Sequence, residues 1–222
     1  MEFFQAYSVH NLLFLVSGLK MTLALAGIVI TMSLLGGTLI AALQYRHIPV
    51  LFELLVIGID TVRNLPPLLI IFFAYFALPA IGINFSPLAA ASIGLSIYGT
   101  ALMAEVIRGG LLSIEKTQAE TAWSQGFTWL QTFRLILLPQ ALVRVIPPLI
   151  GIAVTLIKNT SYAYVVGIVE LTRAGNILYS GNVQFVFPVI CIVALFYFTL
   201  NYSVFSIGRL IEKRTKRNSL ST

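Results

Sequence analysis

Five stretches of this chain stay apolar for about twenty residues or more, and this repetition constrains the fold more than any other feature. An apolar helix of roughly 20 residues is long enough to cross the hydrocarbon core of a bilayer. The stretches lie at about 15–43, 51–79, 87–107, 135–157 and 185–208. The sequence therefore predicts an all-α membrane protein with about five transmembrane helices.

The composition leaves too little polar surface for a soluble globule. Of the 222 residues, 58% are hydrophobic and 10% are charged, whereas a soluble domain carries roughly 25% charged residues. The length suits one compact unit, so we expect a single membrane domain over 1–222. The first residues lack the basic region and the cleavage site of a signal peptide.

The net charge of +6 is concentrated near the C-terminus. In a soluble protein such an excess could indicate nucleic-acid binding. Here it marks a basic tail at 209–222 that faces anionic lipid headgroups on the cytoplasmic side. The tail contains Arg209, Lys213, Arg214, Lys216 and Arg217. We therefore expect no nucleic-acid partner.

The Lys and Arg residues of the connecting segments predict the orientation, because cytoplasmic loops carry the excess of positive charge. With the N-terminus outside and the C-terminus inside, the tail falls inside together with Arg46, Arg108, Lys116 and Arg134. Lys158 and Arg173 fall outside. We therefore expect residues 108–134 to be cytoplasmic.

Few residues of the chain are suited to catalysis or metal binding. The single cysteine, Cys191, excludes an internal disulfide, and one cysteine with two histidines does not make a metal cluster. The sequence contains no GxxxxGK[ST] phosphate loop, so ATP hydrolysis by that device is not expected. We expect no metal, no cofactor and no enzymatic activity in this chain, and a membrane-embedded enzyme is disfavoured.

A polar, amphipathic segment at 119–141 interrupts the membrane-hydrophobic chain. Trp123, Phe127 and Leu130 follow the spacing of one helical face, which predicts a short helix or helix pair. Such an element can dock in a groove of a soluble partner. The alternative is a helix that rests on lipid, although that would predict more Lys and Arg than the stretch 117–133 contains. Composition alone leaves both open.

Three residues are expected to start or interrupt the helices of this segment. Ser113 can cap the start of a helix. Gly126 would interrupt the helix or allow a partner's backbone to come close. Pro139 would lie in the first turn of the fourth span, where its missing N–H costs little.

The segment also carries a specific motif, E-x-A-x3-G-x9-I-x-L-P. Its residues are Glu120, Ala122, Gly126, Ile136, Leu138 and Pro139. This order resembles the EAA loop of ABC-importer permeases, the coupling helix that sits in a cleft of the ATP-binding subunit. Thr121 stands where that family usually has Ala. The resemblance implies a cytoplasmic coupling loop over 113–134, in which Glu120, Thr121, Ala122, Gly126 and Phe127 serve the ATPase.

Further motifs, in order and at family spacing, resemble the polar amino-acid permeases. Ser17–Leu23 is similar to their Gly-x3-Thr-Leu opening, and Thr61–Leu68 to FRGTPLL with Asn64 in place of Gly. Others are Ala104–Gly110 (AEIIRGG), Leu137–Ala141 (LPQA), Pro147-Pro148 and Leu156–Ser161 (LxKxTS). The resemblance implies a type I ABC importer transmembrane fold over about 17–210.

For function, the resemblance implies a permease subunit of an ATP-driven importer of polar amino acids in a bacterial inner or cell membrane. Its implied partners are a second permease, as homodimer or heterodimer, a pair of ATP-binding subunits that use ATP and Mg²⁺, and an extracytoplasmic binding protein. The variants at 63–66 and 158–161 are similar to those of glutamine and glutamate permeases, which favours such cargo over basic amino acids or cystine. An ATP-independent channel or secondary transporter would instead predict inverted repeats.

Asp60, Arg63 and Asn64 lie midway along the second expected span. An ionisable group at the bilayer centre costs at least ~2.5–3.5 kcal/mol, so such groups usually face the bundle interior or a water-filled path. Pro66 and Pro67 follow and remove backbone donors, which predicts a broken helix beside a polar cavity. Asp60 and Arg63 can neutralise each other as an i,i+3 pair, and Arg63 can also bind an α-carboxylate.

Lys158, Asn159, Thr160 and Ser161 supply an ammonium, an amide and two hydroxyls at the end of the fourth span. They either terminate a helix at the outer interface or line the substrate path, as the resemblance implies. Glu170 can receive a substrate ammonium or lie in outer solvent. Glu105 and Arg108 are expected to form a structural pair, and Arg144 lines the path or reaches toward the interface.

Overall fold

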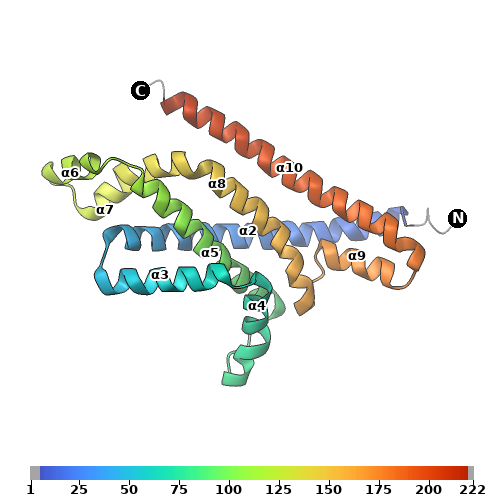
Figure 1. Ribbon diagram of the computed structural model, residues 1–222. Helices are drawn as coiled ribbons and strands as arrows, with labels where there is room; N and C mark the ends of the chain where they lie inside the picture. The colour runs from blue at the N-terminus through green and yellow to red at the C-terminus, as the bar shows by residue number, and fades with distance from the viewer. Residues whose placement is uncertain (1–5, 220–222) are drawn as a thin grey trace. The chain divides into compact units, whose positions relative to one another are not determined.

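Helices make up every regular element between residues 6 and 219, the part of the chain that the computed structural model describes (Figure 1). Side chains are described for residues 6–213. The side chains of Arg214, Lys216 and Arg217 in the basic tail lie outside this range, and so do residues 1–5, where a signal peptide would begin. Helices suit this chain because lipid offers no partners to backbone N–H and C=O groups.

The elements follow one another along the chain without a long unstructured connection. They are α2 (Val9–Arg46), α3 (Pro49–Asn64), α4 (Pro67–Phe72), the π-helix η1 (Phe73–Ala77), η2 (Leu78–Ile81), α5 (Pro87–Leu112), α6 (Lys116–Ser124), α7 (Trp129–Thr132), the π-helix η3 (Phe133–Leu137), α8 (Leu138–Asn159), η4 (Thr160–Val166), α9 (Leu171–Ser180), η5 (Val183–Phe185) and α10 (Val186–Ser219).

Four helical segments are long and apolar enough to cross a membrane. They are Val9–Arg46, Pro87–Leu112, Trp129–Val166 and Val183–Lys213. Counting α3 and the following stretch Pro67–Ile81 as one broken span gives a fifth. The prediction of an all-α fold with about five spans is confirmed. The helices run beyond the apolar stretches, since polar residues at each end continue the helical backbone.

The break in the second span lies where Pro66 and Pro67 predicted it. Pro66 has an extended backbone, with φ −59° and ψ 129°, and Pro67 occupies the first turn of α4. A residue that precedes proline avoids the helical conformation, and this applies to both Leu65 and Pro66. The helix therefore ends at Asn64 and a new one starts at Pro67.

The chain divides into two compact units. The first unit contains the chain up to Thr31, Leu65–Ser96 and Val154–Val204. Its core joins α2, α9 and α10 through a cluster of buried residues: Ala6, Leu15, Leu171, Ala174, Val189 and Ile192. A Cβ added to Gly18 would lie 2.8 Å from the Cβ of Ala174. Glycine therefore allows α2 and α9 to approach closely, as small residues do between membrane helices.

The second unit contains Met32–Asn64, Ile97–Ala153 and the chain from Phe205 onward. Here α2 and α5 approach closely, because a Cβ added to Gly37 would lie 2.8 Å from the Cβ of Met103. Ile59 on α3 packs into a small cluster with Ala101 and Ala104 on α5. These contacts place α3 and the part of α2 from Met32 to Arg46 against α5.

The candidate spans differ in how far the chain itself covers them. In α5, 61% of the most apolar window is buried, against 28% or less in the other three. Large apolar side chains stay exposed on the others; they include Leu35, Leu39, Phe187 and Phe198. Surface of this kind is stable in contact with lipid or with another subunit.

Candidate functional site

The polar segment after α5 folds into a short helix, α6, with one buried and one exposed face. Ala119 and Ala122 are 3% and 2% exposed and hold α6 against its own unit. Glu120, Thr121 and Trp123 are exposed. Residues three apart share a helix face, so two small alanines fix the helix while the neighbouring side chains remain available to a partner.

Gly126 ends the turn after α6 in the left-handed conformation, with φ +85°. Its N–H donates to the carbonyl of Trp123 at 3.0 Å, and the N–H of Phe127 donates to the carbonyl of Ala122 at 3.1 Å. These two bonds form a Schellman motif. A Cβ added at Gly126 would meet nothing within 4 Å. Glycine is therefore needed here for its backbone conformation and not for space within this chain.

A capping box then starts the next helix, α7. The backbone N–H of Gln131 donates to the Thr128 hydroxyl at 3.3 Å, and the N–H of Thr128 donates to Oε1 of Gln131 at 2.8 Å. The helix pair predicted for this segment is present. The expectation that Trp123, Phe127 and Leu130 share one helical face is wrong, because the Gly126 turn separates α6 from α7.

Ser113 does not cap α6, contrary to the expectation. The cap position is Glu115, whose backbone is extended. The Ser113 hydroxyl instead donates to the carbonyl of Gly110 at 2.7 Å, within the last turn of α5. Ser113 also accepts two hydrogen bonds from Nη1 of Arg144 on α8, one at its carbonyl oxygen and one at its hydroxyl. Arg144 therefore holds the end of α5 to α8, which neither of its expected roles anticipated.

A cavity of about 530 Å³ lies against α6. Lys116 and Glu120 line it from α6, and Arg108 lines it from α5. His47, in the connection after α2, and Phe52, in the first turn of α3, also line it. Their rings stack with centroids 4.4 Å apart, and His47 takes φ 54° to make the turn. The cavity therefore combines aromatic surface and an arginine, which are enriched in protein interfaces, with one further charge of each sign at Lys116 and Glu120.

Glu105 and Arg108 form the structural pair that their spacing predicts. Nη2 of Arg108 donates to Oε1 of Glu105 at 2.7 Å and Nε donates to Oε2 at 3.2 Å. The bidentate geometry fixes both side chains and leaves the Arg108 guanidinium oriented at the edge of the α6 cavity.

The polar residues at the end of α3 are not covered by other parts of this chain. Nη1 of Arg63 lies 3.9 Å from Oδ1 of Asp60, and the two side chains are 39% and 61% exposed. The Asn64 amide donates to the carbonyl of Asp60 at 2.7 Å. The expected ion pair is thus present in a long, exposed form. Its guanidinium has donors to spare, since a single 3.9 Å contact does not use the planar fork.

At the end of α8 the four candidate residues separate into two groups. Thr160 is fully buried and its hydroxyl donates to the carbonyl of Ile157 at 2.7 Å. Asn159 is half-buried in the last turn of α8. Lys158 and Ser161 line a cavity of about 320 Å³, together with Thr172 on α9 and Tyr197 on α10. The structure therefore adds two hydroxyls to this group that no sequence motif had indicated.

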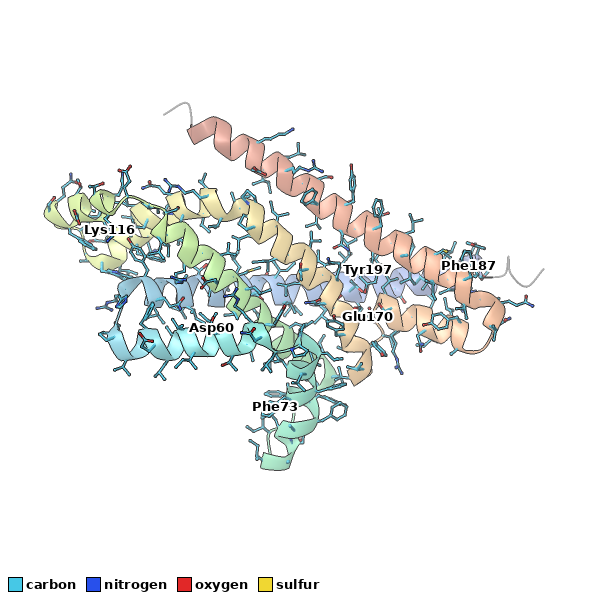
Figure 2. All side chains as sticks on the ribbon, viewed as in Figure 1. Asp60, Phe73, Lys116, Glu170, Phe187 and Tyr197 are labelled. Carbon is cyan, nitrogen blue, oxygen red and sulfur yellow. The ribbon has the colours of Figure 1, made fainter. Side chains whose placement is uncertain are left out.

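Glu170 is fully buried, next to this cavity and outside the membrane-spanning segments. As the N-cap of α9 its carboxylate accepts hydrogen bonds from the N–H groups of Thr172 and Arg173, both at 2.8 Å. The Tyr197 hydroxyl donates to it at 3.1 Å, and Figure 2 shows the two residues close together. Burial raises the pKa of the Glu170 carboxyl, although the backbone donors at Thr172 and Arg173 act in the opposite direction. The expectation of a position in outer solvent is wrong.

The sequence resembles a large transport family along most of its length. The model of the family described as "Binding-protein-dependent transport system inner membrane component" matches residues 33–217. The chain is 42% identical over 216 residues to the probable glutamine ABC transporter permease protein GlnP of Bacillus subtilis (strain 168), covering 96% of this chain and 99% of that one. It is 32% identical over 214 residues to the glutamine transport system permease protein GlnP of Escherichia coli (strain K12), covering 91% and 93%.

Solved structures show the same fold. One described as "Crystal structure of an amino acid ABC transporter with histidines" matches with a TM-score of 0.82 and 29% identity, over 93% of this chain and 96% of that chain. An inward-facing structure of the MetNI methionine ABC transporter matches with a TM-score of 0.78 over 94% and 99%. Its 21% identity supports the likeness of fold alone.

Proposed function

The chain belongs to the family of binding-protein-dependent transport system inner membrane components, and we propose that it forms the membrane path of an ATP-driven importer for glutamine or a similar polar amino acid. The observation that carries this proposal is the full-length similarity, at 42% identity, to a permease described as a probable glutamine transporter. The shape of the α6 segment, described above, supports the same assignment from the chain's own geometry.

The α6 surface, defined as Lys116, Glu120, Thr121, Trp123 and the adjoining cavity, is the proposed docking site for a separate ATP-binding subunit. A short helix seated on alanines and closed by a Schellman turn can transmit force without unwinding. ATP and Mg²⁺ would be used by the partner. Motion at α6 would reach the spans through the Arg144 contact with Ser113 and through α7, which continues into α8.

The cavity beside Lys158 is the proposed place where the chain meets its substrate. Its volume of about 320 Å³ lies at the lower end of the ~300–1,000 Å³ typical of small-molecule sites. The Lys158 ammonium suits an α-carboxylate. The Ser161 hydroxyl can both donate and accept hydrogen bonds, which matches a neutral carboxamide that needs both. The Tyr197 hydroxyl donates to Glu170 and lies 3.2 Å from the Thr172 hydroxyl, so these two offer the substrate acceptor oxygens.

Arg63 and Asn64 are proposed to face the path that this chain shares with a second permease, a homodimer or heterodimer partner. Exposed ionisable residues in a broken membrane helix are expensive in lipid and are expected to face water or protein. In the proposed topology the N-terminus lies outside and the basic tail lies in the cytoplasm. An extracytoplasmic binding protein delivers the amino acid. Glu170 is a weaker candidate for the path, since it is fully buried and its carboxylate already accepts hydrogen bonds from Thr172, Arg173 and Tyr197.

The test is ATP-driven uptake by the chain reconstituted in proteoliposomes with its ATP-binding and substrate-binding partners. Labelled glutamine should accumulate only with ATP, and unlabelled glutamine should compete better than histidine, arginine or cystine. Competition by basic amino acids alone would reject the glutamine assignment while leaving the importer intact. Uptake without ATP would reject the importer itself and favour a channel or secondary transporter.

A further inference from the structure

An apolar groove of about 480 Å³ runs between α2 and the segment from α7 into α8, and none of the roles above uses it. Leu35 and Leu39 line it from α2, and they are 68% and 61% exposed. Leu130 and Phe133 line it from the other side. Apart from Thr38, the polar side chain in the lining is that of Arg134, which is exposed.

The groove has the depth of one bilayer leaflet. Its lining on α2 runs from Leu34 to Leu43, which is about 14 Å at 1.5 Å per helical residue. Half of a hydrocarbon core of about 30 Å is about 15 Å. Both walls also reach the end of a candidate span, since α2 ends at Arg46 and the third candidate span begins at Trp129. The groove therefore extends from headgroup level into the hydrocarbon.

Cationic and aromatic side chains gather at the headgroup end. The Arg46 guanidinium carbon lies 5.5 Å from the centroid of the Trp129 ring. That ring stacks on Phe133, with centroids 5.3 Å apart and planes 6° from parallel. Neither Arg46 nor Arg134 forms an ion pair within the described part of the chain. Two guanidiniums thus lie beside an apolar groove with no counter-ion among the residues that the structure describes.

We propose that this groove binds an anionic phospholipid, with one acyl chain along Leu35 and Leu39 and the phosphate at Arg46 and Arg134. Guanidinium binds phosphate oxygens through two parallel N–H donors. Trp129 suits the headgroup end of the groove, because tryptophan rings are enriched at the headgroup level of membranes. A zwitterionic lipid fills the same groove but gains less, because its own cation is repelled by the two arginines.

The experiment is native mass spectrometry of the full-length chain, purified with its partner subunits, after titration with phosphatidylglycerol or phosphatidylcholine. Wild type should retain phosphatidylglycerol preferentially. Each basic residue near an anionic surface contributes about fivefold in binding, so Arg46→Gln and Arg134→Gln should each lower the preference about fivefold. Leu39→Trp should displace both lipids by filling the groove.

Arg209→Gln is the matched control. Arg209 also stacks on an aromatic ring, with its guanidinium carbon 4.6 Å from the centroid of Phe205, but does not line the groove. It should leave the lipid preference unchanged. Arg134→Lys keeps the charge and should keep most of the preference, which separates loss of binding from loss of folding.

Two outcomes overturn the proposal. One is equal retention of the two lipids by wild type, or an unchanged preference in the Arg46→Gln, Arg134→Gln double variant. The other is disulfide cross-linking of Leu39→Cys between two copies of the chain in the membrane, because a second copy would then occupy the groove.

Discussion

Arg144 on α8 holds Ser113 at the end of α5 by two hydrogen bonds from a single nitrogen, Nη1, to the carbonyl oxygen and to the hydroxyl; the latter distance is 2.9 Å. The contact joins residues 31 positions apart. It lies directly before α6, so under the proposed function any movement of the docked α6 surface would reach the fourth span at this point.

Replacing Arg144 with Ala should therefore separate ATP hydrolysis from transport. Hydrogen bonds to charged groups contribute about 1.5–3 kcal/mol each to stability, so the unfolding midpoint in detergent should fall. ATP hydrolysis by the reconstituted complex should persist while amino-acid uptake per ATP drops severalfold. Arg209→Ala, at an exposed position on α10, is the control. A normal ratio of uptake to hydrolysis in Arg144→Ala would refute the mechanical role.

Gly126 should tolerate substitution according to backbone preference and not according to side-chain size. Its φ of +85° is costly for most residues, by about 1–2 kcal/mol, whereas Asn visits this region more readily. Gly126→Asn should retain most uptake, and Gly126→Val should lose docking of the ATP-binding subunit in a pull-down assay.

Gly27→Val is the matched control for that series. An added Cβ at Gly27 also meets nothing within 4 Å, and its φ is not positive. If Gly126→Asn and Gly126→Val are equally defective while Gly27→Val is normal, the glycine is required for close contact with the partner instead.

Glu170 should make stability depend on pH in a defined direction. Burial raises the pKa of its carboxyl in the folded chain above the value of about 4.3 in an unfolded chain. The folded state then binds the proton more tightly, so this contribution to stability is present below about pH 4.3 and is lost as pH rises through the folded-state pKa. The unfolding midpoint of wild type, measured relative to Glu170→Gln, should accordingly fall as pH rises above about 4.3.

A relative midpoint that is flat, or that rises with pH, would mean that the N-cap donors outweigh burial. Glu170→Ala gives a second test that does not depend on titration. It leaves the N–H groups of Thr172 and Arg173 without their side-chain acceptor and should cost at least about 2 kcal/mol of folding free energy.

The sequence indicated the spans and the α6 segment because each has a local signature. Hydropathy marks a span, proline marks the break after Asn64, and the motif from Glu120 to Pro139 marks the α6 segment. The helical face assigned to Trp123, Phe127 and Leu130 failed for a local reason too: glycine at position 126 takes a left-handed turn, and its presence was the available signal. The spacing of the apolar residues does not extend a helix through a glycine that takes this turn.

Other features had no local signature. The Arg144 contact with Ser113 depends on how α5 and α8 pack. Hydropathy places Ser113 after the third span and Arg144 inside the fourth, and it does not pair them. Burial separated Thr160 from Ser161, although the two are neighbours with similar side chains. The sequence also left open whether Glu170 contacts substrate or solvent. The packing of α9 and α10 buries it, and no local sequence pattern around a single carboxylate predicts that burial.

The different positions of the neighbours Thr160 and Ser161 provide the sharpest test of the proposed substrate cavity. Ser161 and Lys158 line it, while the Thr160 hydroxyl is fully buried and bonded to its own backbone. Loss of a hydrogen bond to a charged group costs about 1.5–3 kcal/mol, or roughly 10- to 150-fold in affinity. Lys158→Ala should therefore raise the KM for glutamine uptake by at least about tenfold, and Ser161→Ala should raise it by a smaller factor. Thr160→Val keeps the shape and should leave KM unchanged, as should Lys213→Ala on the distant part of α10. If Thr160→Val raises KM as much as Ser161→Ala does, the cavity beside Lys158 is not where the amino acid binds.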